Sequence, residues 1–364
     1  MTEENSLPAQ GATVATLDME ERGATRRRLA DSRPTTRLGR WKETIYYMRG
    51  RGALEIGAIY MAIIVAFVTM HLRNSRGFPF LNPSNTSGTL SQNIPVLAIL
   101  AIGAGILMIA GEFDLSIGAS IGFSAIIFIR TAENHSWLLA FLLAVGCSIG
   151  IALLNGAIVV VTRIPSFIAT LGMSFFWIGA TSLLNGNTPA RMEKGKTKFV
   201  VNLFAGDHGR FRSQLIWMLV IAVIMWFVLH RRKWGNHAYA VGGNVAAATA
   251  VSIRPKLVKL QAFALFGALT GVAAVLLAVR AGNMQPNTTG EYTLLAIAAA
   301  VIGGCSLTGG RGTVIGMIIG AAFIRTVENG ILLHKASAFW VQMFVGLTIV
   351  VAAVLNRLVE GKAK

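Results

Sequence analysis

The chain has 364 residues, of which 54% are hydrophobic and only 13% are charged. A soluble globular domain carries about 25% charged residues, so this composition excludes an ordinary soluble enzyme and favours a polytopic helical membrane protein. A net charge of +17 would suggest nucleic-acid binding in a soluble protein. Here the charges lie between long apolar runs, where Lys and Arg mark cytoplasmic loops. We therefore expect a membrane-lipid environment and no nucleic-acid partner.

Residues 1–52 differ from the rest of the chain, with ten Lys or Arg, seven acidic residues and few large apolar ones. They contain no short apolar stretch typical of a signal peptide. We interpret them as a disordered, basic cytoplasmic tail, followed by a transmembrane domain over residues 53–364.

About ten segments are apolar enough to span a membrane, given that a span needs roughly 17–25 residues. With the N-terminus inside, alternation places 21 of the 33 positive residues on the cytoplasmic side, which favours an N-in, C-in topology. The loop over residues 186–212 departs from this bias, because it falls outside and yet carries six basic residues. The segments are 55–72, 93–110, 115–131, 137–161, 164–185, 213–230, 260–280, 291–304, 313–330 and 338–356.

Two of these spans adjoin polar, interrupted segments, at residues 111–116 and 303–312. Non-helical backbone at membrane depth must be buried in protein or line a wet cavity, because lipid cannot satisfy its hydrogen bonds. Residues 303–308 align with 111–116, and 323–329 match 128–134 at six of seven positions. Paired interrupted segments indicate a transport site. The sequence thus predicts two related halves, about 53–212 and 213–356, and leaves open whether their repeat is parallel or inverted.

Charged residues near membrane depth are the first candidates for function. Glu112 and Asp114 lie in the first interrupted segment, where ionisable groups usually face the bundle interior and have a role in the solute path or its gating. A capping role is the alternative, in which Asp114 or Ser116 accepts hydrogen bonds from the start of the next helix. Glycines spaced four apart, such as Gly267 and Gly271, favour close helix packing and say nothing about substrate.

The loop over residues 231–259 is the longest cytoplasmic connection after the tail. Basic residues flank a core of small residues from Gly242 to Ala250, which predicts a turn followed by a short helix with Asn244 as its N-cap. Such a helix suits docking into a partner's groove or lying on the membrane surface.

No pattern in the chain predicts catalysis or a bound cofactor. Gly195-Lys196-Thr197 resembles the end of a phosphate-binding loop, but Ala190 stands where the pattern requires glycine. Two cysteines and six scattered histidines form neither a disulfide framework nor a metal-ligand spacing. We therefore expect no metal, no cofactor, no catalytic residue and no ATP hydrolysis by this chain alone.

The motifs, taken in order, resemble one family. Ile164-Pro165-Ser166-Phe167-Ile168-Ala169-Thr170 follows the first interrupted segment and Asn155-Gly156, and Val241-Gly242-Gly243-Asn244 precedes the second. Together they look like permease subunits of bacterial carbohydrate importers of the ATP-binding-cassette (ABC) type, as for ribose, xylose or fructose, which are related more distantly to branched-chain amino acid permeases. The resemblance covers about residues 90 to 356.

The resemblance implies a multi-pass protein of the bacterial inner membrane that carries a monosaccharide or similar polyol. It implies a cytoplasmic ABC ATPase subunit, a periplasmic sugar-binding protein and a second permease copy as partners. Residues 243–253 match the segment that couples such permeases to the ATPase. The coupling residues are then Gly242, Gly243, Asn244, Ala247, Ala248 and Ile253. The residues of the translocation path or its gating are Glu112, Asp114, Ser116, Asn155, Phe167, Thr170, Gly303, Gly304, Ser306, Gly309 and Gly310.

The chain departs from the family at three positions. Glu112 stands where glycine is common, Ser252 replaces the glycine after the alanine run, and Thr293 replaces a glutamate that commonly follows the tyrosine. Two other classes of function stay open. One is an ATPase-independent secondary transporter or channel, which would need more ionisable groups at mid-membrane than this chain has. The other is a membrane scaffold that transports nothing.

Overall fold

The computed structural model describes residues 53–192, 198–209, 211–286 and 290–361. The chain divides into two units, residues 1–50 and 51–364, and the described residues all belong to the second. The expected tail and the motif Gly195-Lys196-Thr197 lie outside the described residues.

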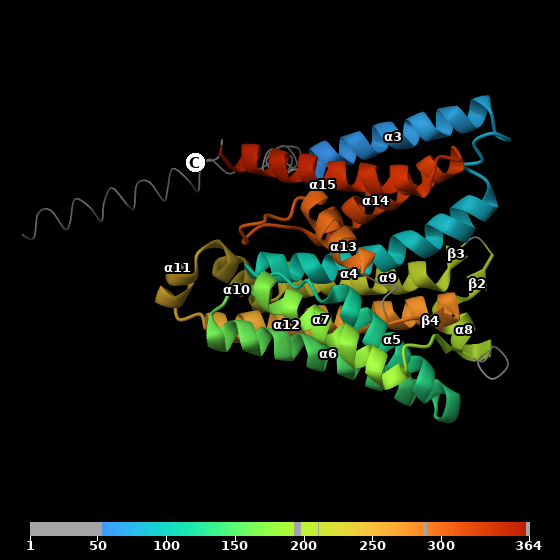
Figure 1. Cartoon of the computed structure of the whole chain (residues 1–364). Helices are drawn as coiled ribbons and strands as arrows, with labels where there is room; N and C mark the ends of the chain where they lie inside the picture. Colours follow the sequence, from blue (N-terminus) through green and yellow to red (C-terminus); the bar gives the residue numbers. More distant parts are fainter. Residues whose placement is uncertain (1–52, 193–197, 210, 287–289, 362–364) are drawn as a thin grey trace, which may run out of the picture. The chain divides into compact units, whose positions relative to one another are not determined.

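The described unit is a helical bundle, and each of the ten predicted spans falls on a helix (Figure 1). Six helices are long and apolar enough to cross a membrane, and shorter apolar helices accompany them. The ten helices are α3 (Ala53–Arg73), α4 (Ser91–Ile109), α5 (Ile117–Asn134), α6 (Trp137–Thr162), α7 (Ser166–Asn185), α9 (Ser213–Arg231), α12 (Pro255–Ala281), α13 (Glu291–Ile302), α14 (Val314–Leu333) and α15 (Ala338–Gly361).

The connections contain shorter elements. These are the π-helix η1 (Ser84–Leu90), the helices α8 (Lys198–Ala205), α10 (Lys233–Gly243) and α11 (Val245–Ala250), and the strands β1 (Ala190–Arg191), β2 (Asp207–His208), β3 (Phe211–Arg212) and β4 (Asn283–Met284). Strand β1 pairs antiparallel with β4, and β2 pairs antiparallel with β3.

The core of the bundle is formed around α4 and α12. Both helices are mostly buried, whereas α6 and α7 leave most of their apolar surface exposed. Close packing of α12 against α6 depends on small residues, as the glycine spacing predicted. A Cβ added at Gly267 would lie 2.7 Å from the backbone oxygen of Ser148, and one at Gly271 would lie 2.7 Å from Cα of Val145.

Helix α12 begins at Pro255, before the apolar segment predicted from residue 260. Proline suits the first turn of a helix, because its fixed φ is helical and its missing N–H group would be unpaired there. The first two turns therefore carry Lys256 and Lys259 on a helix whose later turns are buried.

The loops collect at two ends of the bundle. Helices α10 and α11 lie at one end, and α8 with the short strands lies at the other (Figure 1). At the second end Arg212 Nε donates to the backbone oxygen of Ser87, and β1 pairs with β4. Loops that the alternating topology assigns to one side therefore lie together.

Candidate functional site

The two interrupted segments begin with the same helix ending. After α4, Gly111 has φ +84°, and the N–H groups of Gly111 and Glu112 donate to Met108 and Leu107. After α13, Gly304 has φ +88°, and the N–H groups of Gly304 and Cys305 donate to Val301 and Ala300. Glycine favours this left-handed position because it has no Cβ. At the helix ends Gly111 therefore corresponds to Gly304, and not to Gly303 as the sequence alignment paired them.

The segments stay alike for a few more residues and then diverge. The N–H of Ser116 donates to Asp114 Oδ1 at 2.6 Å, and that of Thr308 donates to Ser306 Oγ at 3.2 Å. Helix α5 then begins at Ile117, whereas α14 begins only at Val314, where Thr313 caps it by accepting from the N–H of Gly316. The second segment is thus longer, which agrees with the sequence matches, whose offset rises from 192 residues at 111–116 to 195 residues at 128–134.

Both segments meet the end of α10. The N–H of Gly310 donates to the backbone oxygen of Ile109 at 3.0 Å. A Cβ added at Gly242 would lie 1.8 Å from that same oxygen and 2.7 Å from Gly310 N. One added at Gly309 would lie 2.7 Å from Gly242 O and 3.1 Å from Cα of Gly111. We call this contact of Ile109, Gly111, Gly242, Gly309 and Gly310 the glycine junction.

Helix α11 follows the glycine junction directly. Its N-cap is Asn244, whose Oδ1 accepts from the N–H of Ala247 at 3.0 Å, as the sequence predicted. Ala248 is buried against its own chain, whereas Ala247 is exposed. The chain leaves α11 at Ser252, which has φ +64°. The N–H of Ile253 then donates to Ala248 O.

The first interrupted segment also holds a buried polar cluster. Asp114 is 3% exposed and accepts hydrogen bonds from Ser116 Oγ at 2.6 Å and from Asn155 Nδ2 at 2.9 Å. Asn155 Nδ2 also donates to Ser116 Oγ at 2.8 Å. Ser116 is the N-cap residue of α5 but makes no side-chain capping bond, so the N–H of Gly118 is paired instead with Thr293 Oγ1 of α13. Asp114 therefore fixes the turn before α5 and does not cap the helix itself.

The start of α7 fastens the same segment from another side. Ser166 Oγ accepts from the N–H of Phe113 at 3.0 Å, and Thr170 Oγ1 accepts from the N–H of Leu115 at 2.9 Å. Thr170, assigned to the path from the sequence, thus holds a backbone N–H of this segment, and so does Ser166, which the sequence did not single out as a site residue. Phe167, also assigned to the path, is 51% exposed and therefore does not belong to this buried cluster.

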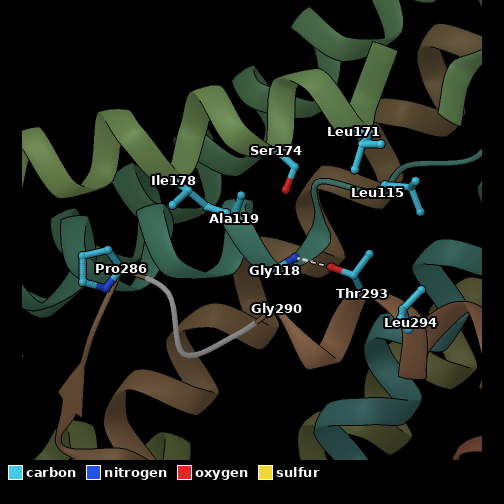
Figure 2. Close-up of a pocket in the computed structure, with 10 residues that line it drawn as sticks. All are labelled: Leu115, Gly118, Ala119, Leu171, Ser174, Ile178, Pro286, Gly290, Thr293 and Leu294. Carbon is cyan, nitrogen blue, oxygen red and sulfur yellow. Dashed lines mark hydrogen bonds between the residues drawn. The ribbon is translucent and has the colours of Figure 1, made fainter. Parts of the chain in front are cut away.

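A cavity of about 260 Å³ lies beside the segment, between α5, α7 and the start of α13 (Figure 2). Among the described residues its lining carries no charged side chain, and the hydroxyl-bearing members are Ser174 and Thr293. None of the residues assigned to the path from the sequence lines it, although Leu115 does and lies next to Asp114. Ser174 and Leu294 had no sequence signal, because they lie within ordinary apolar helices. The lining residues are Leu115, Gly118, Ala119, Leu171, Ser174, Ile178, Pro286, Gly290, Thr293 and Leu294.

The described features define a class: a polytopic helical membrane protein with two interrupted segments that meet at one end and an uncharged cavity within the bundle. The chain belongs to the family of permease components of branched-chain amino acid transport systems, which its residues 88–353 match. It is therefore a multi-pass membrane transport component and not an enzyme.

Curated relatives agree with this class. The chain is 33% identical to the ribose import permease protein of Bacillus subtilis over 310 residues, which are 84% of this chain and 94% of that protein. It is 30% identical to the autoinducer 2 import system permease protein of Salmonella typhi, over 79% of this chain and 82% of that one. It is 28% identical to the fructose import permease protein of Rhizobium meliloti, over 75% and 78%. No solved structure matches the chain significantly.

Proposed function

We propose that the chain is the transmembrane permease subunit of an ABC importer and forms the path for a monosaccharide or similar polyol. The observation that carries the proposal is the glycine junction, in which the end of α10, directly before the exposed helix α11, touches both interrupted segments of a permease-family chain. An element that joins a protruding surface to the interior can pass a partner's movement to a solute path. A separate cytoplasmic ATPase subunit would supply that movement.

The topology in this proposal has ten spans with both termini in the cytoplasm. Residues 111–116, 242–243 and 309–310 all fall on the cytoplasmic side when the spans alternate, and these are the segments that meet at the glycine junction. Helix α15 also ends on the side of α11 (Figure 1). The tail over residues 1–52 would then be cytoplasmic, and the basic loop over 186–212 would face the periplasmic binding protein.

The ATPase would dock on α11. Val245, Ala247 and Val251 are exposed there, and small or branched apolar residues suit close packing against another protein. Gly242 and Gly243 would link this surface to the interior, and Asn244 would cap the start of the helix. Ala248 and Ile253 would pack between the helix and the rest of the chain.

The solute would pass along the interrupted segments and the uncharged cavity. A cavity without charge suits a neutral solute better than an amino acid, whose ammonium and carboxylate groups would need partners. The named relatives import ribose, fructose and autoinducer 2. In this proposal Glu112, Asp114, Ser116, Asn155 and Thr170 hold the first segment in place.

The second segment would form the opposite side of the path. Its assigned residues are Gly303, Gly304, Ser306, Gly309 and Gly310. A second permease copy would cover the exposed apolar surface of α7, including Phe167, and membrane lipid would cover the remaining apolar faces.

The test is reconstitution of the chain in proteoliposomes with a cognate ATPase and a cognate binding protein. The proposal expects uptake of radiolabelled D-ribose or D-fructose that requires all three proteins and ATP. Uptake by the permease alone, driven by an ion gradient, would instead identify a secondary transporter. Binding of the ATPase without any transport would indicate a scaffold.

A further inference from the structure

The first interrupted segment is joined to α12 by a charged pair. Lys259 Nζ lies 2.5 Å from Glu112 Oε1, and the two side chains are 22% and 8% exposed. The other ion pairs found between described residues join residues close in sequence, at Arg130–Glu133, Arg212–Asp207 and Arg325–Glu328. Within the described part of the chain, Lys259–Glu112 is therefore the ion pair that connects distant segments.

Lys259 lies close to α11, whereas Glu112 belongs to the first interrupted segment. Lys259 lies in the second turn of α12, which begins at Pro255 directly after the exit from α11. That exit is held tightly, because Ile253 N donates to Ala248 O and Ser252 turns through a left-handed φ. A displacement of α11 therefore moves Lys259, with few rotatable backbone residues between them.

Glu112 lies at the other end of the link, in the segment that leads to the cavity. Its own N–H closes the end of α4, and the next residues are held by Ser166, Asn155 and Thr170. Leu115, three residues further on, lines the cavity. The segment from Glu112 to Leu115 thus reaches from the ion pair to the cavity wall.

A buried charge without a partner is costly in free energy. Movement of Glu112 and Lys259 as a pair therefore costs less than their separation. Backbone contacts at the glycine junction resist compression, but an ion pair also resists being pulled apart. We propose that Glu112–Lys259 is a positioning pair that transmits displacement of α11 to the Leu115 wall of the cavity, in both directions of the transport cycle. This inference rests on the proposed function and adds residues to it.

The experiment measures solute imported per ATP hydrolysed by the reconstituted complex of permease, ATPase and binding protein. The solute is the sugar that gives ATP-driven uptake with the unmodified chain. Variants Glu112→Gln and Lys259→Met each remove one charge while keeping a side chain of similar length. We expect each to lower the ratio about tenfold, the size of a typical coupling free energy, while binding-protein-stimulated ATP hydrolysis continues.

Two charge-retaining variants and one control variant separate coupling from folding. Lys259→Arg keeps the charge, and the exchange Glu112→Lys with Lys259→Glu reverses the pair, so both should recover most of the ratio. Glu133→Gln neutralises a local pair on α5 and should leave the ratio unchanged. A merely structural role would reduce assembled complex, uptake and hydrolysis together and leave the ratio intact.

The outcomes are distinct. A normal ratio in Glu112→Gln and Lys259→Met, or failure of both charge-retaining variants to recover it, would overturn the positioning pair while leaving the importer function standing. Absence of ATP-driven uptake by the unmodified complex would overturn the proposed function, and the positioning pair with it.

Discussion

Because Gly242 has no side chain, the backbone of α10 can lie against both interrupted segments at once. An added methyl group would meet the backbone oxygen of Ile109 and the backbone nitrogen of Gly310. Its neighbour Gly243 has open space at the corresponding position, with nothing within 4 Å. Two adjacent glycines of one helix therefore have different tasks, and a pair of alanine variants distinguishes them.

Gly242→Ala should open the glycine junction, because backbone atoms cannot yield as a flexible side chain would. Overpacking of this kind commonly costs about 1–3 kcal/mol. We expect a lower thermal unfolding midpoint of the purified permease and reduced uptake per molecule. The matched control, Gly243→Ala, adds the same methyl group in open space and should keep the unfolding midpoint of the unmodified chain. Equal behaviour of the two variants would show that the junction is not closely packed.

Ser252 leaves α11 in a left-handed conformation that costs an L-residue about 1–2 kcal/mol. Ser252→Gly should therefore retain or slightly raise the stability of the purified permease. Ser252→Val should lower it, since a β-branched side chain fits this conformation poorly. Thermal unfolding in detergent compares the two. Greater stability of the valine variant would contradict the described turn.

At the scale of elements, α11 has two faces with different partners. Ala248 packs on its own chain, whereas Ala247 is exposed. Ala247→Trp should leave the permease folded and block docking of the ATPase. Ala248→Trp should destabilise the permease itself, because the site has no space for the ring. Co-purification of the ATPase, together with the permease's own unfolding midpoint, measures both effects. Docking retained in Ala247→Trp would assign the exposed face another role.

The cluster of Asp114, Ser116 and Asn155 joins α6 to the segment before α5. Asn155→Ala removes a donor from a buried carboxylate, which costs about 1–3 kcal/mol. We expect a corresponding loss of unfolding free energy and weaker transport. Asn134→Ala, at an exposed amide at the end of α5, is the control and should change stability by less than about 0.5 kcal/mol. An equally small effect at Asn155 would mean that the cluster does not fix the segment.

For the whole molecule, the two ends of the bundle should lie on opposite sides of the membrane. With Cys147 replaced by Ser, a cysteine at the exposed Asp207 should react with an impermeant thiol reagent in intact spheroplasts. A cysteine at Ala247 should react only after permeabilisation. The reverse pattern would invert the topology.

The sequence was sufficient to predict the helices and several local details. Long apolar runs mark helices because a membrane span needs a minimum length, and the N-cap at Asn244 follows from residue type and spacing. The similarity of the two interrupted segments was also visible, although the alignment paired Gly111 with Gly303, whereas the helix ends pair it with Gly304.

Contacts between distant segments could not be predicted. Gly242 and Gly310 meet because α10 folds back on the bundle, which no local pattern encodes. Ser166 and Thr293 use ordinary hydroxyls to pair backbone N–H groups of another element, so residue type alone does not single them out. The partner of Glu112 is 147 residues away, at Lys259. Long-range pairing needs the fold.

In the proposed importer the ATPase docks on α11. A photoreactive amino acid at Ala247, in the permease co-expressed with the ATPase and binding protein, tests it most directly. We predict crosslinks to the ATPase from Ala247 and none from the same probe at Asp207, at the opposite end of the bundle. Crosslinks to the ATPase from Asp207, or none from Ala247 in a complex that transports, would contradict the account.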